Sequence, residues 1–166
     1  MWGVGVPVSR APVTPAGGSL TGVLEDHFKL DRFVQAQDSG GAYAQALAEL
    51  REGHKRSHWI WFVFPQVVGL GSSPMSERYA ISGLEEAAAY LAHPVLGPRL
   101  IECARVLAEL PERDPVKVMG GIDALKLRSS MTLFARVGGA DAVFSAVLSQ
   151  YFGGVEDRET TRLLGA

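Results

Sequence analysis

Cysteine is almost absent from this chain of 166 residues, since Cys103 is the only one. A single cysteine cannot form an internal disulfide, which excludes the disulfide-rich scaffolds of small secreted proteins. The chain also lacks an excess of positive charge, because 16 lysines and arginines stand against 18 aspartates and glutamates, for a net charge of −2. Dedicated nucleic-acid binders usually carry a basic surface, so we expect no nucleic-acid partner.

Long hydrophobic runs are missing as well. The longest runs from residue 59 to residue 65 and ends at a proline, whereas a membrane-spanning helix needs roughly 20 apolar residues. The N-terminus has no basic start followed by an apolar stretch, so a secretory signal is not expected. We therefore expect a soluble cytoplasmic protein without membrane contact.

Residues 1–22 differ in composition from the rest, with three prolines, five glycines and Arg10 as the one charged residue. Such a segment buries too little surface to offset the entropy lost on ordering it. We expect a flexible tail over residues 1–22. The remaining residues, 23–166, are expected to form a single compact domain.

The start and stop signals of short helices recur along residues 23–166. Ser73 before Pro74 is a typical helix start, and Ser82 with Glu85 has the spacing of a capping box. Glycines and prolines supply the stops, and Asp123, Asp141 and Asp157 supply further caps. The pattern predicts an all-α domain of about seven or eight short helices. The apolar segment 59–64 is expected to be a buried helical turn or an extended core segment.

Familiar catalytic motifs are missing from the sequence. It contains no glycine-rich phosphate loop and no nucleophile elbow. Cys103 lies among apolar residues, which favours an inert buried thiol. His54 and His58 have the spacing of two metal ligands on one helical face, but this requires an unbroken helix and a third ligand. We expect structural roles for both histidines, and neither a metal nor a cofactor.

Two segments carry polar side chains in otherwise apolar surroundings, residues 53–66 and 123–134. Aromatic rings beside lysine, histidine and glutamine are typical of pockets that stack a flat ring and bond its edge. Serines in a helix interior indicate either close helix packing or contact with a polar ligand. The alternative is that the tryptophans anchor the core and the basic groups are solvated. The candidate ligand-binding residues are Lys55, His58, Trp61, Gln66, Arg99, Lys126, Ser129 and Ser130.

Several stretches resemble domain-of-unknown-function family 1810. They are residues 32–37, the Gly53-x-Lys55-x-x-His58 motif continuing to Gln66, residues 86–100 and residues 123–134. The resemblance covers about residues 24–164 and implies a mostly helical bacterial domain. Proteins of that family are often labelled calpastatin, an inhibitor that is disordered when free. We reject this label, because three tryptophans and seven phenylalanines indicate a packed core.

The Phe33-x-x-Ala36-Gln37 element and residues 126–134 are also similar to a superfamily of N-glycosidases related to NAD and ADP-ribose. This distant resemblance implies a pocket for a ribosylated heterocycle, with Trp61 stacking on the ring. Phosphates would meet Lys55, Arg99 or Lys126. An acid, Glu85 or Asp123, would position water for cleavage, although helix capping explains both acids as well.

These observations support two hypotheses about function. The first is a pocket that binds a nucleotide-like or ADP-ribose-like small molecule, with cleavage of its N-glycosidic bond as the associated reaction. The second is a non-catalytic helical interaction module, which would expose a large apolar patch or form a stable oligomer. The first requires that the polar candidates line one cavity, namely Lys55, His58, Gln66, Arg99, Lys126 and Ser129.

Overall fold

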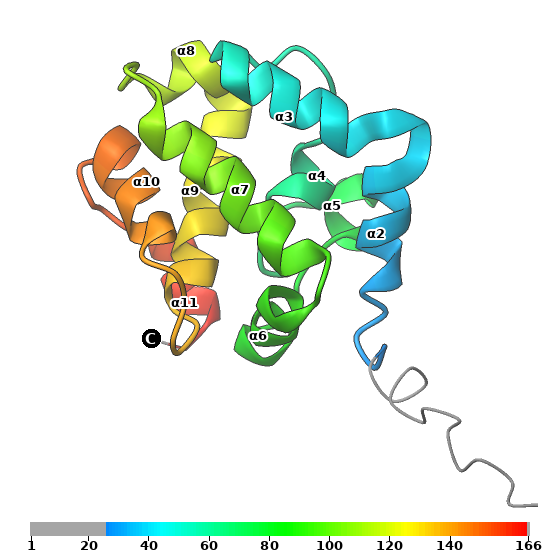
Figure 1. The fold of residues 1–166 in the computed structure, drawn as a ribbon. Helices are drawn as coiled ribbons and strands as arrows, with labels where there is room; N and C mark the ends of the chain where they lie inside the picture. Colours follow the sequence, from blue (N-terminus) through cyan, green and yellow to red (C-terminus); the bar gives the residue numbers. More distant parts are fainter. Residues whose placement is uncertain (1–25, 166) are drawn as a thin grey trace, which may run out of the picture.

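The computed structural model describes residues 26–165, and this part of the chain consists of helices joined by loops (Figure 1). The predicted tail, residues 1–22, lies outside the described residues. The helices are α2 (Asp31–Asp38), η1 (Ser39–Gly41), α3 (Ala42–Glu52), α4 (Ile60–Val63), α5 (Pro74–Arg78), α6 (Leu84–Ala92), α7 (Leu96–Glu109), α8 (Pro115–Met119), α9 (Gly121–Ala135), α10 (Val143–Phe152) and α11 (Arg158–Leu163). Within residues 26–165 the chain forms no strand, which confirms the all-α prediction.

Helix α9 lies at the centre of the domain. It contacts α4, α6, α8, α10 and α11, and every residue from Ser129 to Phe134 is buried. A segment buried on all sides, such as residues 129–134, cannot show a one-sided apolar stripe, which explains why small hydroxyl residues are interspersed with large apolar ones there. Helix α7 crosses α9 in front, between α3 and α10 (Figure 1).

Several predicted helix ends are confirmed. Gly53 ends α3 with a left-handed backbone, φ 75°, which only glycine adopts readily. Ser73 caps α5 by accepting a hydrogen bond from the Ser76 N–H, with Pro74 in the first turn. Asp157 caps α11 in the same way, through the N–H of Thr160. The ambiguous segment 59–64 contains the single helical turn α4, which is largely buried.

Two capping predictions are wrong. Helix α9 starts at Gly121 rather than at Asp123, so Asp123 lies in the first turn and makes no capping bond. Helix α6 is capped by Gly83, so the third helical residue is Glu86 and not Glu85. Glu86 accepts hydrogen bonds from both the N–H and the hydroxyl of Ser82, while Glu85 is exposed.

A buried carboxylate organises the turn that leads from α3 into α4. Glu49 is fully buried, and one of its oxygens accepts the backbone N–H of Arg56 at 2.6 Å and that of Ser57 at 2.8 Å. The indole N–H of Trp59 donates to the same oxygen at 3.2 Å. The other oxygen accepts the Ser57 hydroxyl and the Gln45 amide. Glu49 therefore fixes the backbone from which Lys55, Trp59 and Trp61 project.

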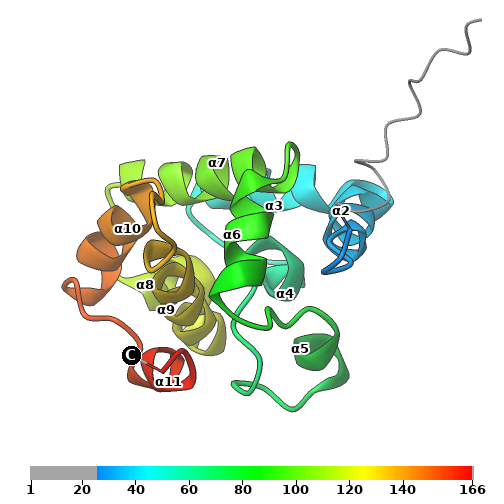
Figure 2. The same ribbon diagram turned by 90° about the horizontal axis from the view of Figure 1, so that it is seen from below.

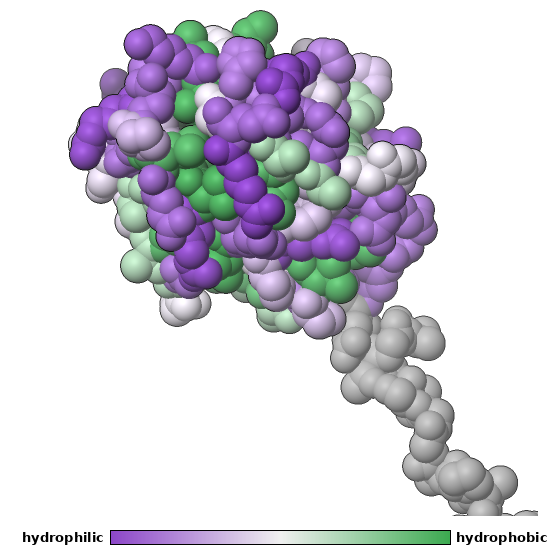
Figure 3. Space-filling model, turned by 45° about the horizontal axis from the view of Figure 1, so that its top comes forward, coloured by the Kyte–Doolittle hydropathy of each residue, from purple (hydrophilic) through white to green (hydrophobic). Residues whose placement is uncertain are grey.

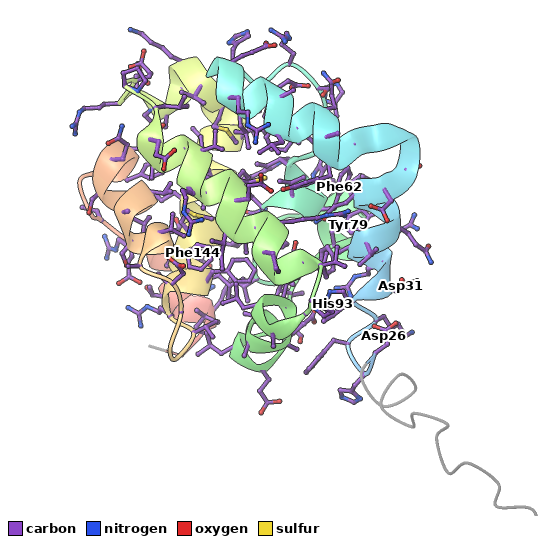
Figure 4. The ribbon with its side chains drawn as sticks, in the orientation of Figure 1. Asp26, Asp31, Phe62, Tyr79, His93 and Phe144 are labelled. Atoms are coloured by element: carbon purple, nitrogen blue, oxygen red, sulfur yellow. The ribbon has the colours of Figure 1, made fainter. Side chains whose placement is uncertain are left out.

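Arg32 joins α2 to the segment that precedes α6. Its guanidinium donates to the carbonyl oxygens of Arg78 and Ala80, both at 2.9 Å, and forms an ion pair of 3.0 Å with Glu86. It also donates to the carbonyls of Phe28 and Lys29. Nearby, the rings of Phe62 and Tyr79 lie side by side with centroids 5.5 Å apart (Figure 4). These contacts hold residues 78–80 against the core.

We expect Arg32→Lys to lower the free energy of unfolding by about 2 kcal/mol, because an ammonium group cannot reproduce the forked set of bonds. Urea denaturation measures this change. Arg51→Lys is the matched control, since Arg51 is exposed and its ion pair with Glu102 is long, at 3.5 Å. The control should change stability by less than about 0.5 kcal/mol. Equal effects of the two substitutions would contradict the anchoring role of Arg32.

The segment between α4 and α6 forms a loop that is closed at its base. Val67 and Ile81 form an isolated parallel bridge, in which Val68 N–H donates to Ile81 O and Ile81 N–H donates to Gln66 O, both at 2.8 Å. The loop carries α5 away from the core and toward the side of the molecule where α11 lies (Figure 2).

None of the helices in residues 26–165 has the length and apolar character required to cross a bilayer. On the face shown in Figure 3, polar residues surround smaller apolar areas.

Candidate functional site

A groove runs between the loop that carries α5 and the helices α9 and α11. Its inner hollow, of about 70 Å³, lies against Trp61 and α5. Its outer hollow, of about 240 Å³, lies between the same loop, α9 and the start of α11. The two hollows share Gln66, Gly71 and Ser76, so they adjoin. Together they approach the lower end of the roughly 300–1,000 Å³ typical of small-molecule sites.

Polar residues contribute to the lining of the inner hollow. Trp61 is one of them, and its Nε1 is buried and makes no hydrogen bond within the described part of the chain. Gln66 and Tyr79 also line this hollow. A buried N–H without an acceptor costs about 1–3 kcal/mol.

Two lysines and one aspartate form a short chain of charges behind the groove. The ammonium of Lys55, 5% exposed, lies 2.7 Å from one oxygen of Asp123 and 4.8 Å from the ring centroid of Trp59. The other oxygen of Asp123 is 3.8 Å from the ammonium of Lys126. Lys126 in turn lies 5.1 Å from the ring centroid of Trp61 and lines the outer hollow. The three charges sum to +1, and the one that lines the groove is the positive charge of Lys126.

The two serines of α9 have different positions. Ser129 lines the outer hollow, and its hydroxyl donates to the carbonyl of Leu125 at 3.1 Å. Ser130 is completely buried, lines neither hollow and has no hydrogen-bond partner within residues 26–165. Thr132 bonds the carbonyl of Arg128 and accepts the N–H of Asp157. Small hydroxyls on α9 therefore serve helix packing as well as the groove.

Besides Ser130, three predicted site residues lie apart from the groove. Arg99 donates to Asp38 at 2.9 Å and to Gln37 at 3.2 Å, and it covers the ring of Tyr43. His58 is exposed in the loop before α4, and Glu85 is exposed on α6. The structure thus brings together Trp61, Gln66, Lys126 and Ser129, with Lys55 behind them through Asp123, and leaves out His58, Arg99, Ser130 and Glu85.

The residues considered for metal binding and nucleophilic chemistry have other environments. His54 and His58 follow the end of α3, so they do not share a helical face, and no three histidine, cysteine or acidic side chains of residues 26–165 are placed to hold a metal ion. Burial raises the pKa of the Cys103 thiol to about 12, so it stays protonated at neutral pH.

Two walls of the groove were not predicted from the sequence as parts of a site. Ser76 and Tyr79 come from α5 and the loop around it, and Asp157 and Glu159 come from the start of α11. These acids already have partners, since Asp157 accepts the N–H and hydroxyl of Thr160, and Glu159 pairs with Arg162. Glycine is required at Gly71, where a Cβ would lie 2.5 Å from the Ser76 hydroxyl oxygen, and at Gly69, where φ is +102°.

Fold and groove together define a helical domain with a groove on one face, and comparison with known proteins gives its family. Residues 27–164 match the family described as "Protein of unknown function (DUF1810)", and the chain belongs to it. The structure is similar to the crystal structure of the conserved hypothetical protein Rv1873 from Mycobacterium tuberculosis, with 53% sequence identity and a TM-score of 0.80. The match covers 84% of this chain and 98% of that one. No curated protein matches the chain.

Proposed function

We propose that the groove binds a small molecule of the nucleotide-like or ADP-ribose-like class, with a flat heterocycle and an anionic group. The observation that carries this proposal is that Trp61 lines the inner hollow while its buried Nε1 has no acceptor among residues 26–165. A ring nitrogen or carbonyl oxygen of a heterocycle is an acceptor of the right kind. Gln66 and Tyr79 supply further groups to bond the edge of the ring.

The anionic part of the ligand is assigned to Lys126. Its ammonium borders the outer hollow and is separated from Asp123 by 3.8 Å, a long ion pair that leaves most of its hydrogen-bonding capacity to a ligand. Lys55 contributes indirectly, because its close pair with Asp123 offsets the charge of that carboxylate. Phosphate or carboxylate oxygens are the groups that a lysine at such a mouth binds.

Cleavage of an N-glycosidic bond in this groove would depend on Asp123, the acid next to Lys126. Neither Asp123 nor Glu85, the other acid considered, lines either hollow. Since both oxygens of Asp123 face ammonium groups, we assign it the role of positioning Lys126. Binding of the ligand, rather than its hydrolysis, is therefore the function that the geometry supports best.

A thermal-shift series on the full chain tests binding, with ADP-ribose, NAD and riboflavin precursors as ligands. A ligand present at a hundredfold excess over its Kd should raise the Tm by about 5 °C or more. Trp61→Phe keeps an aromatic side chain but removes the indole N–H, and Lys126→Met removes the positive charge. Each variant should therefore show a smaller rise in Tm. Lys117→Met is the control, because Lys117 is exposed and lines neither hollow. The absence of any shift with all three ligand types would count against the proposal.

The alternative, a non-catalytic interaction module, is favoured by one observation. Ile122 and Leu125 are exposed side by side in the first two turns of α9. If they form a protein interface, sedimentation should reveal a concentration-dependent oligomer that Leu125→Ser dissociates. A monomer at all concentrations favours the ligand-binding groove.

A further inference from the structure

The mouth of the groove carries large apolar side chains that are exposed to solvent. Ile122 is 73% exposed and Leu125 is 65% exposed, the highest values among the large hydrophobic residues in the described part of the chain. Both line the outer hollow, and Leu70 lines the same hollow from the loop. Exposed apolar residues scattered singly need no explanation, whereas residues gathered at one hollow indicate that something apolar is bound there.

The charged residues at the mouth do not compete for this surface. Glu159 pairs with Arg162, and the Asp157 carboxylate accepts two bonds from Thr160, so both acids are directed toward α11 itself. Lys126 connects the two hollows. Its ammonium lies over the ring of Trp61, which lines the inner hollow, and Lys126 itself lines the outer hollow. The groove thus offers Trp61, Gln66 and Tyr79 in its inner hollow, which Glu77 also lines, a cation at Lys126, and the exposed side chains of Ile122 and Leu125 at its mouth.

We infer that the ligand is amphiphilic: a flat polar ring in the inner hollow, an anionic group at Lys126, and an apolar arm that covers Leu70, Ile122 and Leu125. This inference rests on the proposed function and adds the substrate class to it. The polar ring is assigned to the inner hollow, because burying it against Ile122 and Leu125 would leave its hydrogen-bonding groups unpaired.

A matched pair of probes tests for the arm. Anilinonaphthalene sulfonate and aminonaphthalene sulfonate share a flat ring, an amine and a sulfonate anion, and only the first carries an apolar phenyl arm. Titration calorimetry on the full chain should show that the probe with the arm binds about tenfold more tightly, as expected for a phenyl ring that is partly buried. The double variant Ile122→Ser with Leu125→Ser should remove this tenfold difference.

The control is Leu84→Ser, which alters an exposed leucine of α6 that lines neither hollow and should leave the difference intact. Lys126→Met separates the two proposals, because it should weaken both probes equally. If Lys126→Met weakens binding but the double variant preserves the tenfold difference, the arm is refuted and the proposed groove stands. If none of the groove variants weakens either probe, the proposed function fails together with the inference. A dimer that the double variant dissociates would also refute the arm.

Discussion

Replacing Glu49 with alanine should lower the free energy of unfolding by about 4 kcal/mol, as measured by urea denaturation at pH 7. The substitution deletes the acceptor of five hydrogen bonds, including that of the buried Trp59 indole. Each buried donor left without an acceptor costs about 1–3 kcal/mol, partly recovered by relaxation and water. Glu52→Ala is the matched control on the same helix. Glu52 is exposed and pairs only with Arg56, so its loss should cost less than about 0.5 kcal/mol.

Glu49 should also make stability fall in acid. Burial alone would raise the pKa of its carboxyl, but hydrogen bonds from Ser57, Arg56 and Gln45 outweigh it and lower the pKa from 4.5 to about 2. Because the folded-state pKa is the lower one, the stabilisation is complete above about pH 4.5 and is lost as the pH falls toward 2. The difference corresponds to about 3 kcal/mol.

The acid effect is measured by comparing wild type with Glu49→Gln, which keeps the shape of the side chain but does not titrate. Between pH 5 and pH 2 the wild type should lose about 3 kcal/mol more than the variant. Parallel losses in the two proteins would show that Glu49 is not the group responsible.

Gly97→Ala is expected to cost about 3 kcal/mol or more, the second large effect. A Cβ at this position would lie 2.0 Å from the carbonyl oxygen of Leu91 and 2.9 Å from its carbonyl carbon, so α6 and the start of α7 would have to move apart. The corner has little freedom to do so, since His93 Nδ1 accepts the N–H groups of Val95 and Leu96 there (Figure 4).

Thermal and urea unfolding measure this effect, with Gly121→Ala as the control. Gly121 lies in the first turn of α9, and a Cβ there would meet nothing within 4 Å. Alanine in a helix is favoured over glycine by up to about 1 kcal/mol, so the control should be neutral or stabilising. A mild effect of Gly97→Ala, similar to that of the control, would mean that the corner opens easily.

Local sequence signals predicted most of the helices, because caps and stops act through the nearest three or four residues. Ser73, Gly53 and Asp157 illustrate this. The errors at Asp123 and Glu85 arose where a glycine starts the helix a residue or two away from the expected cap. A glycine N-cap has no side chain that would identify it in the sequence, so sequence patterns favour the neighbouring acid or serine as the cap.

The sequence predicts only part of the candidate site, because only some of its walls come from segments with a recognisable sequence pattern. Residues 53–66 and 123–134 do meet, at Trp61, Lys126 and Ser129. Arg99 was grouped with them by residue type, yet α7 directs it toward Asp38. The walls from α5 and α11 depend on packing between distant segments, which leaves no pattern in the sequence. Glu49 did leave a signal, an acid beside Leu47 and Leu50 on the apolar face of α3.

The bridge between Val67 and Ile81 has a consequence for how this domain can diversify. Since both ends of the intervening loop are tied to each other, residues 68–77 form a cassette whose exposed positions can change with little effect on the rest of the fold, while Tyr79 stays packed on Phe33 and Phe62. The cassette supplies one wall of both hollows, whereas the charges of Lys55, Asp123 and Lys126 come from outside it. On the proposed function, grafting this loop between related domains should change which ligand is bound while retaining Lys126.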